Sequence, residues 1–238
     1  MIPHKVSVTL VEPRYPVNVG YVARVMKNFG VESMFLVRPS VDMAVAAIYA
    51  AHGADVLEKA RVVSWSKLRK SNEVLIATTA IRAKRRSNIV RRGVTPEDAM
   101  NSVPLAKSTS IVFGRETTGL TNEEIRACDI TTVIATGSRY PTLNISHAAA
   151  ILLYILANRQ PSGRRGSKRN SRELFARQLR ELALASRLPS YKADNIGEEA
   201  RRAAAVSKLT DRQLVAMAGV FRRAVNTIEE RQFLDSKT

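Results

Sequence analysis

The chain has 238 residues, a length that fits one large domain or one domain with a smaller second one. Its 38 lysines and arginines against 21 aspartates and glutamates give a formal net charge of +17, which favours a polyanionic partner. Nucleic acid fits this charge better than an anionic membrane or a merely solvated basic surface, because no amphipathic anchor accompanies it. A single cysteine excludes an intrachain disulfide, and three scattered histidines predict no metal site. The sequence has no signal-peptide core and no apolar run long enough for a bilayer, so we expect a cytoplasmic protein.

Residues 1–158 alternate short apolar strands with helices that begin behind capping residues. The strands are predicted at 5–11, 33–37, 61–64, 74–79, 109–113 and 130–135. The helices are predicted behind Asn18, Asp42, Thr95 and Thr121, and at 66–71 and 146–158. This alternation predicts an α/β fold with an open, mostly parallel sheet, whose ligand sites lie at the carboxyl ends of the strands.

The character of the chain changes after Asn158. Residues 159–170 are rich in Lys, Arg, Ser and Gly and contain no acid, which predicts a flexible basic linker. Residues 171–238 show only helical periodicity, with a first helix from Leu174, a second over 196–209 and a third behind a capping box at Thr210. Three helices in fewer than seventy residues make a core that is marginal alone, so we expect this domain to pack on the first domain or on a partner subunit.

The first of three candidate motifs is residues 18–24, with the sequence NVGYVAR, between the first strand and the first helix. Asn18 is interpreted as the helix cap, and Gly20 permits close approach of a ligand or a second backbone. Arg24 by itself could be an ordinary surface residue of an amphipathic helix. Its position on a helix that begins at a strand end favours a functional role.

The second motif is residues 112–120, with the sequence VFGRETTGL, between a buried strand and the Thr121 cap. It is a glycine-containing turn without the Lys-Ser/Thr pair of a phosphate-binding Walker loop. Its acid, Glu116, suits a cationic or hydroxyl-rich ligand. The alternative is an ordinary turn with structural glycines.

The third motif is residues 141–146, with the sequence PTLNIS, which opens an apolar helix. Asn144 or Ser146 could cap that helix, and both could also hold a cofactor or substrate. A further segment, 82–92, carries six basic residues in eleven directly after a strand end. It could be a solvated loop, but its place beside the inferred pocket favours a contact with an RNA backbone.

The three motifs, in this order and at these spacings, resemble those of SPOUT-class RNA ribose 2′-O-methyltransferases, in the TrmH/TrmJ branch. The resemblance covers residues 5–158, and the appended helical domain is most similar to the TrmJ type, in an archaeal form. It implies a C-terminal trefoil knot, S-adenosyl-L-methionine as cofactor, tRNA as substrate with methylation at anticodon-loop nucleotide 32, and a homodimer in which the partner completes each site. A ribosomal RNA 2′-O-methyltransferase and a non-catalytic RNA-binding protein on the same fold are the alternatives.

The resemblance also implies roles for individual residues. The implied catalytic set is Arg24, Glu116, Asn144 and Ser146. The implied cofactor contacts are Thr79, Ala80, Ile81, Gly114, Ile134, Thr142 and Leu143. The expected RNA contacts are Asn18, Arg82, Lys84, Arg85, Arg86, Arg115, Arg164 and Arg165.

Arg24 is the residue that the resemblance places at the ribose 2′-hydroxyl. Because a guanidinium is effectively always protonated in proteins, we favour a role in orienting the ribose or stabilising the developing alkoxide. A phosphate oxygen or a water would then accept the proton. The alternative is that a desolvated pocket deprotonates the arginine and makes it the base.

Overall fold

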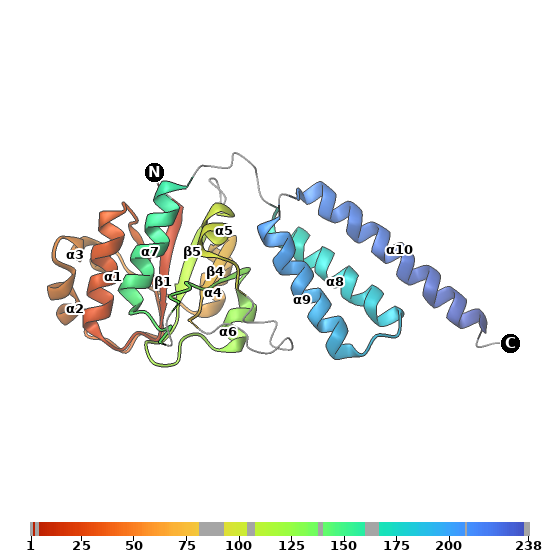
Figure 1. Cartoon of the computed structure of the whole chain (residues 1–238), viewed down its shortest axis with the longest axis horizontal. Helices are drawn as coiled ribbons and strands as arrows, with labels where there is room; N and C mark the ends of the chain where they lie inside the picture. The colour runs from red at the N-terminus through yellow and green to blue at the C-terminus, as the bar shows by residue number, and fades with distance from the viewer. Residues whose placement is uncertain are drawn as a thin grey trace. The chain divides into compact units, whose positions relative to one another are not determined.

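The computed structural model describes residues 2, 5–80, 93–103, 108–137, 140–159, 167–207 and 209–235. The chain divides into two compact units, residues 1–163 and 164–238 (Figure 1). Several predicted site residues lie outside the described residues: Ile81, Arg82, Lys84, Arg85, Arg86, Arg164 and Arg165. The trefoil knot stays a prediction.

The first unit is built on a six-stranded sheet in which all the paired strands are parallel, in the order β3-β2-β1-β5-β4-β6. The strands are β1 (Val6–Val11), β2 (Ser33–Val37), β3 (Arg61–Val62), β4 (Val74–Thr78), β5 (Thr109–Phe113) and β6 (Ile130–Thr132). The residues of β1 and β5 are all buried, as expected for strands covered on both faces. Because the strands are parallel, their carboxyl ends share one edge of the sheet.

The helices of the first unit follow the strands in chain order. They are α1 (Pro16–Asn28), α2 (Met43–Ala50), the 3-10 turn η1 (Ala51–Gly53), α3 (Ala54–Glu58), α4 (Trp65–Ser71), α5 (Pro96–Asn101), α6 (Asn122–Ala127) and α7 (Ile145–Asn158). The caps at Asp42, Thr95 and Thr121 form as predicted, and Thr121 makes the full capping box with Glu124.

Helices cover both faces of the sheet and make a three-layer α/β/α sandwich (Figure 1). On one face, Leu68 of α4 and Ile125 of α6 pack in a buried cluster with side chains of β1, β2, β4 and β5. On the other face α7 packs against α1 and α5. Helix α1 contains the first motif, and α7 begins within the third. These two helices therefore lie side by side.

The second unit is a bundle of three helices: α8 (Arg169–Ala185), α9 (Ser190–Val206) and α10 (Asp211–Asp235). Helix α8 packs against both α9 and α10, around a core that contains Phe175, Ala200 and Leu214. The rings of Phe175 and Phe221 lie 5.7 Å apart. The packing of this bundle on the first unit or on a partner subunit stays a prediction.

Three sequence-based assignments were wrong in detail. Helix α1 begins at Pro16, so Asn18 lies inside its first turn and its side chain does not cap the helix. The strand predicted over 130–135 ends at Thr132, and residues 133–137 carry no regular structure. Helix α9 begins at Ser190, six residues before the predicted start, because Pro189 ends the preceding turn and serves as its N-cap.

Candidate active site

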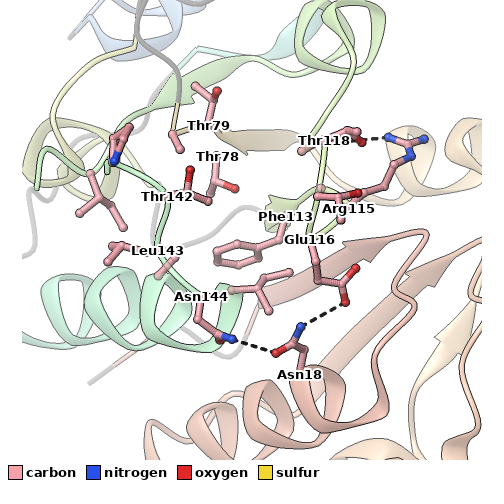
Figure 2. A pocket seen from close by; sticks show the side chains of 18 of the residues that line it. Asn18, Thr78, Thr79, Phe113, Arg115, Glu116, Thr118, Thr142, Leu143 and Asn144 are labelled. Atoms are coloured by element: carbon pink, nitrogen blue, oxygen red, sulfur yellow. Dashed lines mark hydrogen bonds between the residues drawn. The ribbon is translucent and has the colours of Figure 1, made fainter. Parts of the chain in front are cut away.

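The ends of three neighbouring strands enclose a cavity of about 490 Å³ in the first unit (Figure 2). Strands β4, β5 and β6 contribute its floor, the turn after β5 forms one wall, and the segment before α7 forms the other. The cavity is lined by Asn18, Thr78, Thr79, Ala80, Phe113, Gly114, Arg115, Glu116, Thr117, Thr118, Gly119, Thr132, Ile134, Tyr140, Pro141, Thr142, Leu143, Asn144, Ile145 and Ala148. Its size and its mixed apolar and hydroxyl lining are typical of small-molecule sites.

A chain of side-chain hydrogen bonds joins the three motifs at this cavity (Figure 2). Asn18 Nδ2 donates to Glu116 Oε1 at 3.3 Å, and Asn144 Nδ2 donates to Asn18 Oδ1 at 2.9 Å. Asn144 Oδ1 in turn accepts from the backbone N–H and the hydroxyl of Ser146, at 2.8 and 2.7 Å. Residues 128 positions apart in the chain are thus held in one polar network.

Glu116 uses one carboxylate oxygen and leaves the other available. Its Oε1 also accepts from the backbone N–H groups of Arg14 and Tyr15, each at 3.4 Å. Within the described part of the chain, its buried Oε2 has no hydrogen-bond partner. A buried carboxylate oxygen without a donor is costly, so this oxygen is suited to accept a hydrogen bond from a ligand.

The turn from Gly114 to Leu120 is tight, and its glycines are required. A Cβ on Gly114 would lie 2.2 Å from the Gly119 carbonyl carbon and from the Leu120 nitrogen. Gly119 has a φ of +67° and donates its N–H to the Arg115 carbonyl at 2.8 Å. The turn is therefore a closed loop, which fixes the direction in which Glu116 points.

Arg115 lies in a cluster of ion pairs beside this turn. It pairs with Glu12 at 2.7 Å and with Glu124 at 2.9 Å, and only 15% of its side chain is exposed. Hydrogen bonding to Arg115 lowers the pKa of Glu12 to about 2, and these two carboxylates raise the pKa of Arg115. Arg115 therefore holds the loop in place, and its predicted contact with RNA stays a prediction.

Most of the predicted site residues within the described chain meet at this cavity. The predicted cofactor contacts that line it are Thr79, Ala80, Gly114, Ile134, Thr142 and Leu143. Asn18, Glu116 and Asn144 also line it, and Ser146 is buried directly behind Asn144. Asn144 is the helix cap, so its capping and site interpretations hold together.

Arg24 is the exception. It is exposed on α1 and does not line the cavity of its own chain. It lies six residues beyond Asn18, or about 9 Å along the helix axis. Sequence reasoning also missed several lining residues, among them Thr78, Phe113 and Tyr140. The position of Thr78 and Phe113 at strand ends was the available signal.

Among the described residues, no group of three or more His, Cys, Asp or Glu side chains could hold a metal ion. Among the helices described, none combines the length and the apolar character needed to cross a membrane.

In open parallel α/β sheets, small-molecule ligands bind at the carboxyl ends of the strands, which is where this cavity lies. The chain belongs to the SpoU rRNA Methylase family, whose model matches residues 5–154. It is a methyltransferase of this family.

Curated relatives include a tRNA (cytidine-2′-O-)-methyltransferase TrmJ from Methanocaldococcus jannaschii, 33% identical over 79% of this chain and 86% of that protein. The TrmJ proteins of Sulfolobus acidocaldarius and Escherichia coli are also 33% identical over 63% of this chain. These two alignments span 64% and 61% of the relatives, so they cover less than two thirds of their length.

Solved structures share the fold over 66% to 98% of this chain. TrmJ from Zymomonas mobilis has a TM-score of 0.64 at 20% identity, and covers 94% of this chain and 99% of that one. A methylase-family protein from Haemophilus influenzae has the same TM-score at 23% identity, with coverages of 98% and 99%. The AdoMet complex of the SpoU methyltransferase AviRb from Streptomyces viridochromogenes has a TM-score of 0.52 at 21% identity, over 66% of this chain and 58% of that one.

Proposed function

We propose that this chain is an S-adenosylmethionine-dependent tRNA ribose 2′-O-methyltransferase that modifies nucleotide 32 of the anticodon loop. Cytidine is the favoured nucleotide and uridine the second. The observation that carries the proposal is the hydrogen-bonded chain Glu116–Asn18–Asn144–Ser146, which joins all three motifs at one cavity. A protein that had kept only the fold would not need these side chains together.

The choice of tRNA as the substrate rests on how much of this chain aligns with a tRNA methyltransferase. The alignment with the Methanocaldococcus jannaschii tRNA methyltransferase covers 79% of the chain, more than the first unit contains. It therefore continues beyond the methylase domain towards the helical unit. A ribosomal RNA enzyme would share the first unit but has no reason to share this extension.

The lining of the cavity suits the chemistry of S-adenosylmethionine. A nucleoside with hydroxyls and a sulfonium charge suits a cavity that offers threonine hydroxyls, apolar walls and one unpartnered carboxylate oxygen. The residues that would hold it are Thr79, Ala80, Gly114, Ile134, Thr142 and Leu143. When bound, this cofactor supplies an activated methyl group.

The chain's own residues then have to place a ribose hydroxyl in line with that group. Glu116 is positioned to accept a hydrogen bond from a ligand hydroxyl through Oε2, while its Oε1 is fixed by Asn18. Asn144 holds Asn18 and caps α7, so the wall of the cavity and the polar chain are held by the same residue.

Arg24 enters the proposal through a homodimer. It is exposed on α1 one turn after Tyr21, whose ring packs edge-on against Tyr49 at 5.9 Å. Tyr21, Tyr49 and Ile48 are 41%, 39% and 76% exposed, an apolar patch of the kind that protein interfaces cover. In the proposed dimer, Arg24 completes the site of the partner, where its guanidinium orients the ribose and stabilises the developing alkoxide.

The helical unit, residues 171–238, and the basic linker, residues 159–170, are proposed to hold the tRNA body, the dimer partner or both. The basic segment 82–92 is proposed to contact the RNA backbone beside the cavity. These roles follow from the formal charge of +17 and from the positions of the segments in the chain.

The test is methyl transfer from labelled S-adenosylmethionine to unmodified tRNA transcripts, followed by mapping of the 2′-O-methyl group. We expect incorporation at nucleotide 32, and its loss by at least about 100-fold in Arg24→Ala with tRNA affinity within about twofold of wild type. A matched control is Arg126→Ala, on α6 and outside the cavity lining.

Four other outcomes of this experiment would change the proposal. Incorporation at another tRNA position keeps the chemistry and removes the assignment to nucleotide 32. Incorporation only into ribosomal RNA favours the second enzyme class. Tight, salt-sensitive tRNA binding without any transfer favours a non-catalytic RNA-binding protein. Equal losses of rate and affinity in Arg24→Ala would contradict the role given to Arg24.

A further inference from the structure

Four charged side chains form a cluster beside the turn after β5, which we call the ionic clamp: Glu12, Arg38, Arg115 and Glu124. Arg115 Nη1 and Nη2 bind both oxygens of Glu124, at 2.9 and 3.0 Å, and its Nε binds Glu12 Oε2 at 2.7 Å. Arg38 binds the other oxygen of Glu12 at 2.7 Å and reaches Glu124 at 3.4 Å. The clamp joins residues that follow β1, β2 and β5 to helix α6.

The backbone at the clamp is strained in two places. Glu12 and Arg38, which follow directly after the ends of β1 and β2, have φ values of +49° and +47°. Residues other than glycine avoid this region, and they persist there where the surroundings impose it, often near functional sites. Both strained residues direct their charged groups into the same cluster.

The clamp is linked to the site through neighbouring residues on one loop. Figure 2 shows Arg115 directed away from Asn18, and Glu116, the next residue, directed towards it. Arg115 also donates to the Gly119 carbonyl at 3.2 Å, which closes the turn from within. The loop after β5 and the segment 12–15 are thus joined twice, by Arg115 to Glu12 and by Glu116 to the Arg14 and Tyr15 amides.

We propose that the ionic clamp is a positioning device for methyl transfer: Arg115, held by Glu12 and Glu124, sets the position of Glu116 and so of the polar chain at the cavity. The clamp residues Glu12, Arg38 and Glu124 do not line the cavity. They act through Glu116, and this role rests on the function proposed above for the cavity. Lysine cannot replace Arg115, because it lacks the planar fork that binds Glu124 through two nitrogens and Glu12 through a third.

The first arm of the test is independent of activity. Hydrogen–deuterium exchange is measured on the full chain for wild type, Arg115→Lys and Asp55→Asn. Asp55 forms a 2.7 Å ion pair with Lys27 in the same unit but outside the cavity lining. We expect Arg115→Lys to accelerate exchange several-fold in both 12–15 and 114–121, and Asp55→Asn to leave both segments as in wild type. Unchanged exchange at 12–15 in Arg115→Lys overturns the proposal.

The second arm is a double-mutant cycle in single-turnover methyl transfer, with Arg115→Lys and Glu116→Gln. We expect Arg115→Lys to lower the transfer rate by about 100-fold, with the KM for tRNA within about twofold of wild type. If Arg115 acts through Glu116, the double variant is no slower than Glu116→Gln alone. If the rate loss of the double variant equals the product of the two single losses, the proposal is overturned.

Two safeguards separate the possible failures. If Arg115→Lys does not fold, Glu12→Gln, which keeps the shape of a half-exposed side chain, replaces it in both arms. If the wild-type chain transfers no methyl group to any RNA, the proposed function fails, while the exchange arm still decides whether the clamp couples the two loops.

Discussion

At the scale of residues, the site depends on asparagine side chains that donate and accept at the same time. Asn18 is 8% exposed, donates to Glu116 and accepts from Asn144. An amide carries both a donor and an acceptor, so it can link a carboxylate to a second amide, which a carboxylate or a hydrocarbon in its place could not do. Asn18 is therefore the link on which the alignment of Glu116 with α7 depends.

Replacement of Asn18 by alanine is expected to reduce both methyl transfer and stability. The variant leaves Glu116 and Asn144 without their shared partner, which should cost about 1–3 kcal/mol of unfolding free energy. Loss of alignment should lower the transfer rate by about 10–100-fold. The measurements are urea unfolding and single-turnover transfer.

The matched control is Asn28→Ala, which removes an exposed asparagine at the other end of α1. It should leave both quantities unchanged. Equal transfer rates in Asn18→Ala and Asn28→Ala would contradict the role given to the polar chain.

At the scale of elements, helix α1 is held close to α2 by a glycine. A Cβ on Gly20 would lie 2.4 Å from the Ala46 carbonyl oxygen and 2.6 Å from Tyr49 Cβ. Since α1 also packs on α7, a shift of α1 would move Asn18 away from Asn144. The sequence interpretation of Gly20 as a point of close approach is confirmed, and the neighbour is a second backbone.

Gly20→Ala is expected to destabilise the first unit by about 1–3 kcal/mol, because the clash is with backbone atoms that cannot move independently. Gly219→Ala on α10 is expected to stabilise the protein instead, because a Cβ there meets nothing within 4 Å. Alanine in a helix interior gains about 0.5–1 kcal/mol over glycine. Chemical denaturation of the full-length variants measures both, and a neutral Gly20→Ala would contradict the packing described.

At the scale of the whole molecule, two units share one chain. The first, residues 1–163, holds the sheet, the cavity and the polar chain, and the second, residues 164–238, is a three-helix bundle with its own small core. A large excess of positive charge makes phosphate binding dependent on salt, because each neutralised phosphate releases counterions. The proposed function assigns methyl transfer to the first unit and tRNA binding to the second.

Deletion of residues 164–238 is expected to leave a folded first unit that binds S-adenosylmethionine with unchanged affinity and binds tRNA weakly. The salt dependence of tRNA affinity should become shallower, since fewer phosphates are contacted. Calorimetry with the cofactor and filter binding of tRNA at two salt concentrations measure these effects. Unchanged tRNA affinity in the truncated chain would remove the RNA-binding role from the second unit.

The sequence by itself determined the α/β class, the position of nearly every element and the three motifs. It did so because alternating apolar runs and caps such as Asp42, Thr95 and Thr121 act over a few residues. The sequence analysis took Asn18 as a helix cap, whereas α1 begins at Pro16. It also missed η1 and α3, because their position depends on the close packing of Gly53 against the backbone of α1. Thr79 and Gly114, which the family resemblance placed at the cofactor, line the cavity, whereas their neighbours Thr78 and Phe113 were missed.

Only the tertiary structure decided which polar atoms are satisfied and by whom. Asn18, Glu116 and Asn144 are far apart in the sequence, and no periodicity could have shown that they bond in one chain. The same holds for the ion pairs of Arg115 with Glu12 and Glu124, and for the position of Arg24 outside its own cavity. Local preference sets where a strand or helix begins, whereas hydrogen bonds and ion pairs between distant side chains exist only once the sheet brings the strand ends to one edge.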